Sequence, residues 1–406
     1  MTIGVPTFCG ARLAQARIAR GLTKKSLAEL IGITGTQIAR YESGQDNPQI
    51  ERLDIISEKL NFPVSFFQKP NWKDADSPIF WRSQAAETKM AREMTEQRLD
   101  WLKEIFDYLE SDVEFPRLEI SELQFHDDFR LLTPNKIEAL AEKARARWGL
   151  RELPIPDVTL ALENVGIPVV HLDIPSDKQD GFCCWSERLQ RMFVGVNVYN
   201  VSCARARFDV AHELGHALLH QNVTDAQVRD KALHKVLETQ AHRFAGAFLF
   251  PRDAFYKEVE YTSLDYFCNL KRRWGMSIGA MIYRAFDLGL IDKNECSNYY
   301  RNMTRRGWKG VLREPFDDPK SMPLEKPRML KRAFEACFGS NKSSQAAFFA
   351  EMAFPESEVR QILFGSSEEE KQGEVIEFHN PNLGPAIKLK DLETGTIVPF
   401  SSLRRN

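Results

Sequence analysis

Residues 207–220 read RFDVAHELGHALLH, the segment that decides the fold and chemistry of the larger part of the chain. If this segment is helical, His212 and His216 lie one turn apart on the same face, roughly 6 Å from each other. Two imidazoles placed in this way can bind one metal ion, and Glu213 between them can reach a water molecule on that ion. The pattern predicts a metal site in which Glu213 is the catalytic base.

A site of this kind needs a third protein ligand. His220 lies a further turn along the same helix, out of reach of an ion between His212 and His216. We therefore expect it to pack beside the site without binding the ion. Residues 235–251, KVLETQAHRFAGAFLFP, predict the next helix, and Glu238 on it can lay a carboxylate across the first helix. A set of two histidines and one glutamate leaves the fourth position open for water.

A second readable segment, residues 21–48, is GLTKKSLAELIGITGTQIARYESGQDNP. Thr23 and Thr34 are good N-caps for two short helices. Gly32 between them can adopt the left-handed conformation that ends the first helix. Two helices joined by such a turn form a helix-turn-helix, whose second helix can enter the major groove of DNA.

The exposed positions of this unit carry side chains suited to DNA. Glutamine can pair with adenine and arginine with guanine, each through two hydrogen bonds. We expect contacts to bases from Thr36, Gln37 and Arg40, and contacts to phosphates from Lys24, Lys25 and Asn47. The alternative is a three-helix cap that serves dimerisation or docking and touches no DNA.

Composition sets the broad class of the protein. The chain has 406 residues, enough for two to four domains of roughly 100–200 residues each. No apolar run approaches the roughly 18–20 residues of a membrane span, and the N-terminus shows no secretory signal. The seven cysteines are scattered without a CxxC pair, so we expect a reducing cytoplasm rather than a disulfide framework.

The charge is nearly balanced, with 55 Lys and Arg against 57 Asp and Glu and a net charge of −2. This balance argues against a chain coated with nucleic acid. Residues 1–67, however, contain eight basic and six acidic side chains. Their small positive excess predicts modest, salt-sensitive DNA binding that depends on a dimer and on specific contacts.

The first 60 or so residues resemble the lambda-repressor-like XRE family. The resemblance rests on the LAELIG core, the I-x-R-Y-E-x-G end of the second helix and the N-P turn after it. In that family an arginine of the first helix pairs with a glutamate at this end, so the resemblance implies a buried ion pair between Arg17 and Glu42. Gly35 departs from the longer polar residue that is usual at its position.

About 190 residues, roughly 130–320, resemble the ImmA/IrrE family of zinc metallopeptidases. The motifs are RFDVAHELGHALLH, ETQAHRFAGAFLFP, the upstream IPDVTLALENVGIPV and the downstream LKRRWGMSIGAMIYRAFDLGLI. The resemblance implies zinc as the cofactor and three ligands to it: His212, His216 and Glu238. It implies that Glu213 is the general base. His242 stands where the family usually has asparagine, and it can support a ligand, stabilise an oxyanion or compete as a ligand.

The pattern of apolar and polar residues along the sequence predicts a multidomain, mainly α protein with one α+β, zincin-like domain. We expect a helix-turn-helix domain at 1–70, a linker and long helix at 71–130, the peptidase domain at 131–320, and a helical unit with a strand-like tail at 321–406. The clearest expected elements are helices at 85–110, 134–148, 156–165, 327–338, 345–352 and 356–364, and strands at 167–172 and 191–198. The strand at 192–199 can offer an edge to an extended peptide.

Together these features predict a cytoplasmic transcriptional regulator that binds a palindromic operator as a homodimer and carries its own zinc endopeptidase. The resemblance implies cleavage of a repressor or antitoxin-type protein in a stress, phage-defence or toxin–antitoxin circuit. One alternative is a non-proteolytic transcription factor whose zincin-like domain senses a ligand or partner, or a zinc fold that binds metal without turnover. Another is a helix-turn-helix that docks a partner antitoxin instead of DNA.

Overall fold

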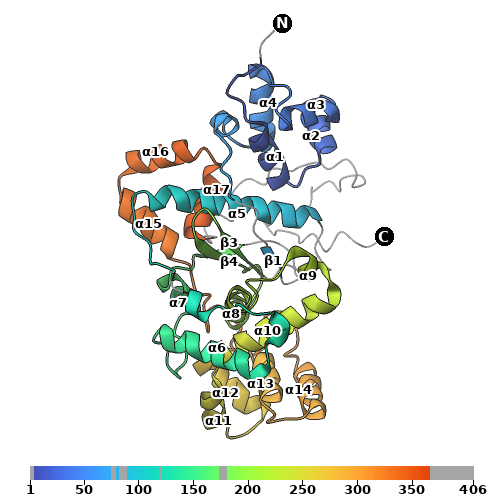
Figure 1. The fold of residues 1–406 in the computed structure, drawn as a ribbon, viewed down its shortest axis with the longest axis vertical. Helices are drawn as coiled ribbons and strands as arrows, with labels where there is room; N and C mark the ends of the chain where they lie inside the picture. Colours follow the sequence, from blue (N-terminus) through green and yellow to red (C-terminus); the bar gives the residue numbers. More distant parts are fainter. Residues whose placement is uncertain (1–3, 75–78, 82–88, 119, 173–180, 366–406) are drawn as a thin grey trace, which may run out of the picture.

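The fold is that of a computed structural model, in which residues 4–74, 79–81, 89–118, 120–172 and 181–365 are described. Figure 1 shows the helix-turn-helix unit at one end of the long axis, then a long helix with three C-terminal helices beside it. A small sheet lies in the middle, and the remaining helices fill the other end. The predicted strand-like tail lies outside the described residues.

The first unit is a bundle of short helices whose ends are set by local sequence. They are α1 (Gly10–Ala19), α2 (Lys24–Ile31), α3 (Gly35–Glu42), α4 (Ile50–Leu60) and the 3-10 helix η1 (Val64–Gln68). The side chain of Thr23 accepts a hydrogen bond from the backbone of Ser26, and Thr34 accepts one from Gln37. Gly32 has a φ of +69°, which an L side chain rarely adopts. The predicted caps and turn of the helix-turn-helix are therefore confirmed.

The long helix and the C-terminal helices pack onto this unit and share its hydrophobic core. They are α5 (Lys89–Glu110), α15 (Met329–Phe338), α16 (Lys342–Met352) and α17 (Glu356–Phe364). Trp101 of α5 is fully buried, with its ring centroid 5.6 Å from Phe62, 6.4 Å from Phe66 and 5.3 Å from Phe354. These rings join segments more than 280 positions apart in sequence into one body. The predicted domain limits at residues 70, 130 and 320 stay predictions.

The sheet has four strands in the order β1-β3-β4-β2. They are β1 (Ile79–Trp81), β2 (Val169–Leu172), β3 (Gly181–Ser186) and β4 (Arg191–Asn197). β4 pairs antiparallel with β3 on one side and parallel with β2 on the other. The prediction that this strand offers a free edge to a peptide is therefore wrong. β1 and β3 lie in segments for which the sequence pattern predicts no strand.

The two faces of the sheet belong to two different hydrophobic cores. Cys183 and Val194 point into the core that contains the metal-site helices, whereas Phe182 and Phe193 point into the core shared by α5 and the helix-turn-helix. The ring of Phe182 lies against Gly195, where an added Cβ would come within 2.3 Å of ring atoms. Because all seven residues of β4 are buried, its sequence is almost continuously apolar.

The other end of the molecule is helical. It contains η2 (Ser121–Leu123), η3 (Phe129–Leu131), α6 (Pro134–Arg147), α7 (Val158–Asn164), α8 (Cys203–Leu219), α9 (Asp225–Arg229), α10 (Lys231–Leu249), α11 (Arg252–Glu258), α12 (Leu264–Trp274), α13 (Ile278–Asp287) and α14 (Lys293–Arg305). A buried ion pair between Arg284 of α13 and Glu138 of α6, 2.5 Å apart, joins these helices across the core. The structure confirms a multidomain, mainly helical protein with one α+β part. Among the described residues, no helix combines the length and apolarity that crossing a membrane requires.

Candidate metal centre and DNA-contacting surface

The metal centre is built where α8 and α10 pack against each other. Gly215 of α8 makes this close approach possible, since an added Cβ would lie 3.1 Å from the carbonyl oxygen of Ala241 and 3.2 Å from the ring of Phe244. Its small size therefore makes room for α10. Sixteen of the seventeen residues of α8 are buried, which anchors the side chains it presents to α10.

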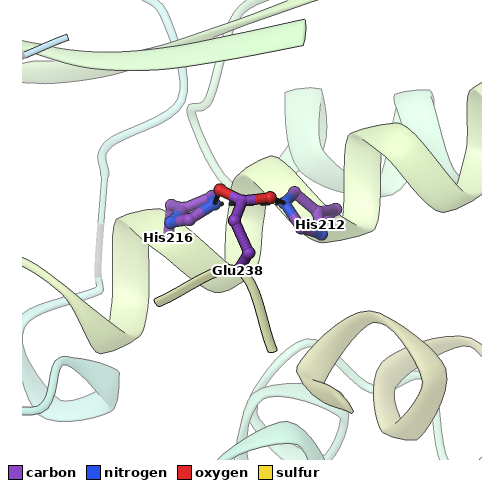
Figure 2. A group of neighbouring side chains, drawn as sticks. All are labelled: His212, His216 and Glu238. Carbon is purple, nitrogen blue, oxygen red and sulfur yellow. Dashed lines mark hydrogen bonds and ion pairs between the residues drawn. The ribbon is translucent and has the colours of Figure 1, made fainter. Parts of the chain in front are cut away.

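Three side chains converge at this contact, as Figure 2 shows. The Nε2 atoms of His212 and His216 are 3.1 Å apart. The two carboxylate oxygens of Glu238 lie 3.3 Å from His212 Nε2 and 3.2 Å from His216 Nε2. Ligands held 2.0–2.1 Å from a tetrahedral zinc ion are separated by roughly 3.3–3.4 Å. The three donors thus have nearly the spacing that zinc requires, and the structure brings together the three predicted ligands.

The electrostatics of the group favour a charged Glu238. Burial alone would raise the pKa of this carboxyl, but the neighbouring imidazoles of His212 and His216 outweigh burial and hold the pKa well below its usual range. A carboxylate that stays ionised next to two imidazoles is the form that binds a cation.

His220 contacts the back of the site. Its Nδ1 lies 2.9 Å from Nδ1 of His216, and its Nε2 lies 3.0 Å from Oε1 of Gln240. Gln240 in turn donates from Nε2 to the backbone carbonyl of Phe129, 2.8 Å away. Because a carbonyl only accepts, the Gln240 amide must present its own oxygen to His220, which then donates from Nε2 and accepts at Nδ1. His216 therefore carries its proton on Nδ1 and directs the lone pair of Nε2 towards the metal position.

We expect Gln240→Leu to weaken metal binding by about 10–100-fold, the usual cost of losing a hydrogen-bond partner behind a ligand. The change removes the acceptor that sets the His220 tautomer, while His212, His216 and Glu238 stay in place. Competition with a chromogenic zinc chelator measures the affinity. Thr239→Ala, at an exposed position of the same helix, is the matched control. Equal affinity in both variants would contradict the role given to Gln240.

Glu213 lies on the side of α8 that faces the sheet and is fully buried. Its Oε1 is 2.9 Å from the point where Gly181 of β3 would carry a Cβ, so a larger residue there would have to displace the carboxylate. The thiol of Cys183, two residues along β3, lies close enough to this carboxylate for the charge of Glu213 to act on it. Burial, and then the nearby Glu213 charge, raise the pKa of the Cys183 thiol well above its usual range, so the thiol stays protonated and can donate. Sequence reasoning placed neither Gly181 nor Cys183 at the site, because their approach to Glu213 depends on how β3 packs against α8.

His242 lies away from the three donors. Its ring packs between Phe208 of α8 and Tyr283 of α13, with centroid distances of 4.7 and 4.8 Å. It is not in the group of described residues that can share one ion. His234, one turn before Glu238, lies 4.0 Å from that carboxylate and is partly exposed.

The helix-turn-helix contains the ion pair that the XRE resemblance implies. Nε of Arg17 lies 2.5 Å and Nη2 lies 3.1 Å from the carboxylate oxygens of Glu42, and both side chains are largely buried. Arg17 also donates to the carbonyl of Leu22, which leads into α2. The pair therefore fixes α3 against α1 and the turn before α2, and the prediction is confirmed.

The residues predicted to contact bases share one acidic neighbour. Thr36 and Arg40 are exposed and Gln37 is half-buried. Gln37 donates to a carboxylate oxygen of Asp46, 3.2 Å away, and Arg40 lies 3.6 Å from the same oxygen. Asp46 therefore engages both side chains that are best suited to reading bases.

The residues predicted to contact phosphates are exposed but also have local partners. Lys24 lies 3.4 Å from Glu42, and Lys25 lies 3.8 Å from Glu29. The side chain of Asn47 donates to the carbonyl of Val5, 3.0 Å away. At such exposed positions ion pairs are weak, so both lysines can turn to a phosphate at little cost.

Three other basic residues of this unit bind partners within the protein. Arg12 is fully buried and lies 2.8 Å from Glu104 of α5, and Arg20 lies 2.7 Å from Glu358 of α17. Arg52 donates to the carbonyl of Ile31. The positive excess counted from the sequence therefore overstates the basic charge that this unit presents to DNA.

Comparison with known proteins assigns the two parts to families. Residues 13–67 match the helix-turn-helix family model, and residues 162–286 match that of the IrrE N-terminal-like domain, peptidase family M78. An uncharacterized HTH-type transcriptional regulator of Sinorhizobium medicae is 43% identical over 58 residues, 14% of this chain and 42% of that protein. One of Rickettsia conorii is 32% identical over 63 residues, 16% of this chain and 50% of that protein.

The chain thus spans half or less of the length of these two relatives. A solved Mycobacterium tuberculosis transcriptional regulator is 21% identical to this chain. The match covers 46% of this chain and 51% of the regulator, and its TM-score is only 0.29. The two family matches fall on the two units described above, the capped helix pair and the α8–α10 site. The chain joins an XRE-type helix-turn-helix domain to an IrrE N-terminal-like domain of peptidase family M78.

Proposed function

We propose that this protein is a DNA-binding transcriptional regulator that carries a zinc-dependent endopeptidase in the same chain. One observation carries the proposal: two imidazole nitrogens and a carboxylate converge at 3.1–3.3 Å, and Glu213 lies on the same helix beside His212. A domain that only used metal for stability would not need a glutamate at this position. The XRE-type domain supplies the means of binding DNA.

The donor set fits zinc. Two neutral imidazoles and one carboxylate are a common catalytic zinc set, and three protein ligands leave one position open. When bound, the ion supplies Lewis acidity for a substrate carbonyl and an attacking water at neutral pH. The chain's own residues hold the donors in place: α8 presents both histidines, α10 presents Glu238, and Gln240 with His220 orients His216.

Glu213 is the residue we assign to proton transfer. It accepts a proton from the attacking water and delivers it to the amine that leaves when the peptide bond breaks. Gly181 leaves room for the carboxylate against β3, and the protonated thiol of Cys183 lies near it.

As substrate we propose a DNA-bound repressor or antitoxin-type protein, in a stress, phage-defence or toxin–antitoxin circuit. The support is physical. A chain that binds an operator through its first domain holds its peptidase beside other proteins on that DNA, at a high effective concentration. Two copies of the helix-turn-helix on a palindromic operator fit the two-fold symmetry that such domains use.

A second candidate is a transcription factor that senses metal without cutting protein. The low exposure of the site favours it, because His212, His216 and Glu213 are each at most 2% exposed and Glu238 is the most open of the group, with its side chain 23% exposed. A third candidate is a helix-turn-helix that docks a partner protein instead of DNA. In that case Gln37 and Arg40 could keep their contacts with Asp46.

The test is metal analysis of the purified protein, followed by incubation with the protein products of flanking genes and mass spectrometry of the fragments. The proposal expects one zinc ion per chain and new peptide termini that a chelator abolishes. Stoichiometric zinc without any cleavage would favour the sensor. Absence of zinc would refute the peptidase.

We expect Arg40→Ala to weaken binding to the protein's own promoter DNA by about 1–3 kcal/mol, the usual cost of losing a base contact. Asp46→Asn should strengthen binding, because it releases Gln37 and Arg40 and removes a negative charge from the DNA-facing surface. Fluorescence anisotropy with labelled promoter fragments at fixed salt measures both. If neither variant changes binding, this surface does not read DNA.

A further inference from the structure

A second basic surface lies far from the helix-turn-helix. Residues 296–313, CSNYYRNMTRRGWKGVLR, contain five basic side chains and no acidic one. They are Arg301, Arg305, Arg306, Lys309 and Arg313, and all five are exposed. The segment covers most of α14 and the turn after it and lies beyond the matched peptidase region, which ends at residue 286.

The outer face of α14 is suited to hydrogen bonding as well as to charge. Its inner face is anchored by Cys296 and Met303, both buried in the core. On the outside, Asn298, Asn302 and Thr304 alternate with the arginines and are exposed. Arginine and asparagine side chains without a nearby carboxylate are the donors that commonly contact phosphate and sugar oxygens in DNA.

One nearby acidic group compensates part of this charge, and the others have partners of their own. Asp265 pairs with Arg306, 2.5 Å away. Glu314 lies 2.9 Å from the buried Lys271 and accepts from the backbone of α13, and Asp317 binds the same lysine. The side chain of Glu295 accepts a hydrogen bond from the backbone of Asp292 at the N-terminus of α14.

The remaining bases keep an uncompensated charge. Arg301 and Arg305 donate to the side chains of Asn298 and Asn302, which are neutral. Between α14 and the start of α12 lies a hollow of about 450 Å³, lined by Arg305 and Arg306 among others. Figure 1 shows α14 at the end of the long axis opposite α3. A DNA segment on α14 would therefore not compete with one on α3.

We propose that α14 and the turn that follows it form a second DNA-binding surface, which contacts the phosphate backbone of duplex DNA without reading its sequence. Charge complementarity supports this occupant, because all five bases are exposed and residues 296–313 contain no acidic side chain. The surface lets one molecule hold two DNA segments, or one bent segment. The proposal goes beyond the peptidase and operator functions and depends on neither.

The test uses the full chain and a 30-bp duplex without palindromic sequence, with binding measured across a KCl series. Each phosphate contact contributes about 0.9 to the slope of log K against log salt. R301S/R305S/K309S should lower that slope by about 2–3. K136S/K143S/K326S removes the same charge from exposed positions elsewhere and should leave the slope unchanged. The variant R301K/R305K, which keeps the charge, should retain the wild-type slope.

Binding of polyglutamate, an acidic polypeptide, is measured in parallel as a second probe. Three results would overturn the proposal: an unchanged slope in the patch variant, an equal fall in both triple variants, or a patch variant that loses polyglutamate binding while its DNA binding stays intact. The last would mean that the surface binds acidic protein. Thermal melting of each variant checks that the fold is retained. Repeating the series in a Q37A/R40A background separates the two surfaces, because the slope change should persist when operator-specific binding has been lost.

Discussion

Glu213→Gln is expected to abolish peptide hydrolysis while leaving the metal bound. Glutamine keeps the shape of the side chain but cannot take a proton from water, and loss of a general base typically costs about 10²–10⁴-fold in rate. His212, His216 and Glu238 are untouched, so zinc content should stay at one ion per chain. The rate is measured with a peptide library from a digested bacterial proteome, by mass spectrometry of new termini, and the zinc by elemental analysis.

His212→Ala is the matched comparison, because it should lose both zinc and hydrolysis. The conservative Cys183→Ser should retain most activity, since its hydroxyl can still donate to Glu213. A Glu213→Gln protein that cuts as fast as the wild type would refute the role of the base. A Glu213→Gln protein that loses zinc as well would show that the carboxylate holds the site together instead.

The features that could be predicted from sequence are those encoded within one or two turns of chain. The caps at Thr23 and Thr34 and the turn at Gly32 involve hydrogen bonds and backbone angles set by immediate neighbours. The spacing of His212 and His216 needs only helical periodicity. Glu238 could be predicted on a separate helix because the apolar stretch after it, Phe244–Phe250, would pack that helix across the first one.

The features that could not be predicted depend on long-range packing. Glu213 meets Gly181 because β3 pairs with β4, and no local pattern marks residues 181–186 as a strand. Gln240 reaches His220 only once α10 has packed on α8. The prediction of a free edge at residues 192–199 failed for the same reason. A strand buried on both faces has the same apolar sequence whether it lies at an edge or inside the sheet.

The sheet lies between the two candidate sites. Cys183 faces Glu213 on one side, and the adjacent Phe182 and Cys184 face the core of α5 and the helix-turn-helix on the other. Arg12 and Arg20 attach α1 to α5 and α17 through ion pairs. The DNA-binding unit is therefore packed on the rest of the chain, and β3 lies between its core and the core of the metal site.

The strength of this attachment gives the second large prediction. Glu104→Ala leaves the fully buried Arg12 without its carboxylate, and breaking a buried pair in this way costs about 3–5 kcal/mol of unfolding free energy. Because Arg12 also donates to the carbonyl of Pro70, we expect the lower end, about 3 kcal/mol. Urea titration measures the loss, and hydrogen exchange should show it in α1 and α5 while α8 and α10 keep their protection.

The double variant Arg12→Met, Glu104→Leu distinguishes a lost charge pair from lost packing. It removes both charges and fills the same space with apolar atoms, a replacement that is often neutral or stabilising. Lys69, which lies 3.0 Å from Glu104, has its side chain 27% exposed and can turn to water. The double variant should therefore recover most of the stability that Glu104→Ala loses. If it is as unstable as the single variant, shape rather than charge holds α1 on α5. If Glu104→Ala is itself neutral, the helix-turn-helix does not depend on this contact.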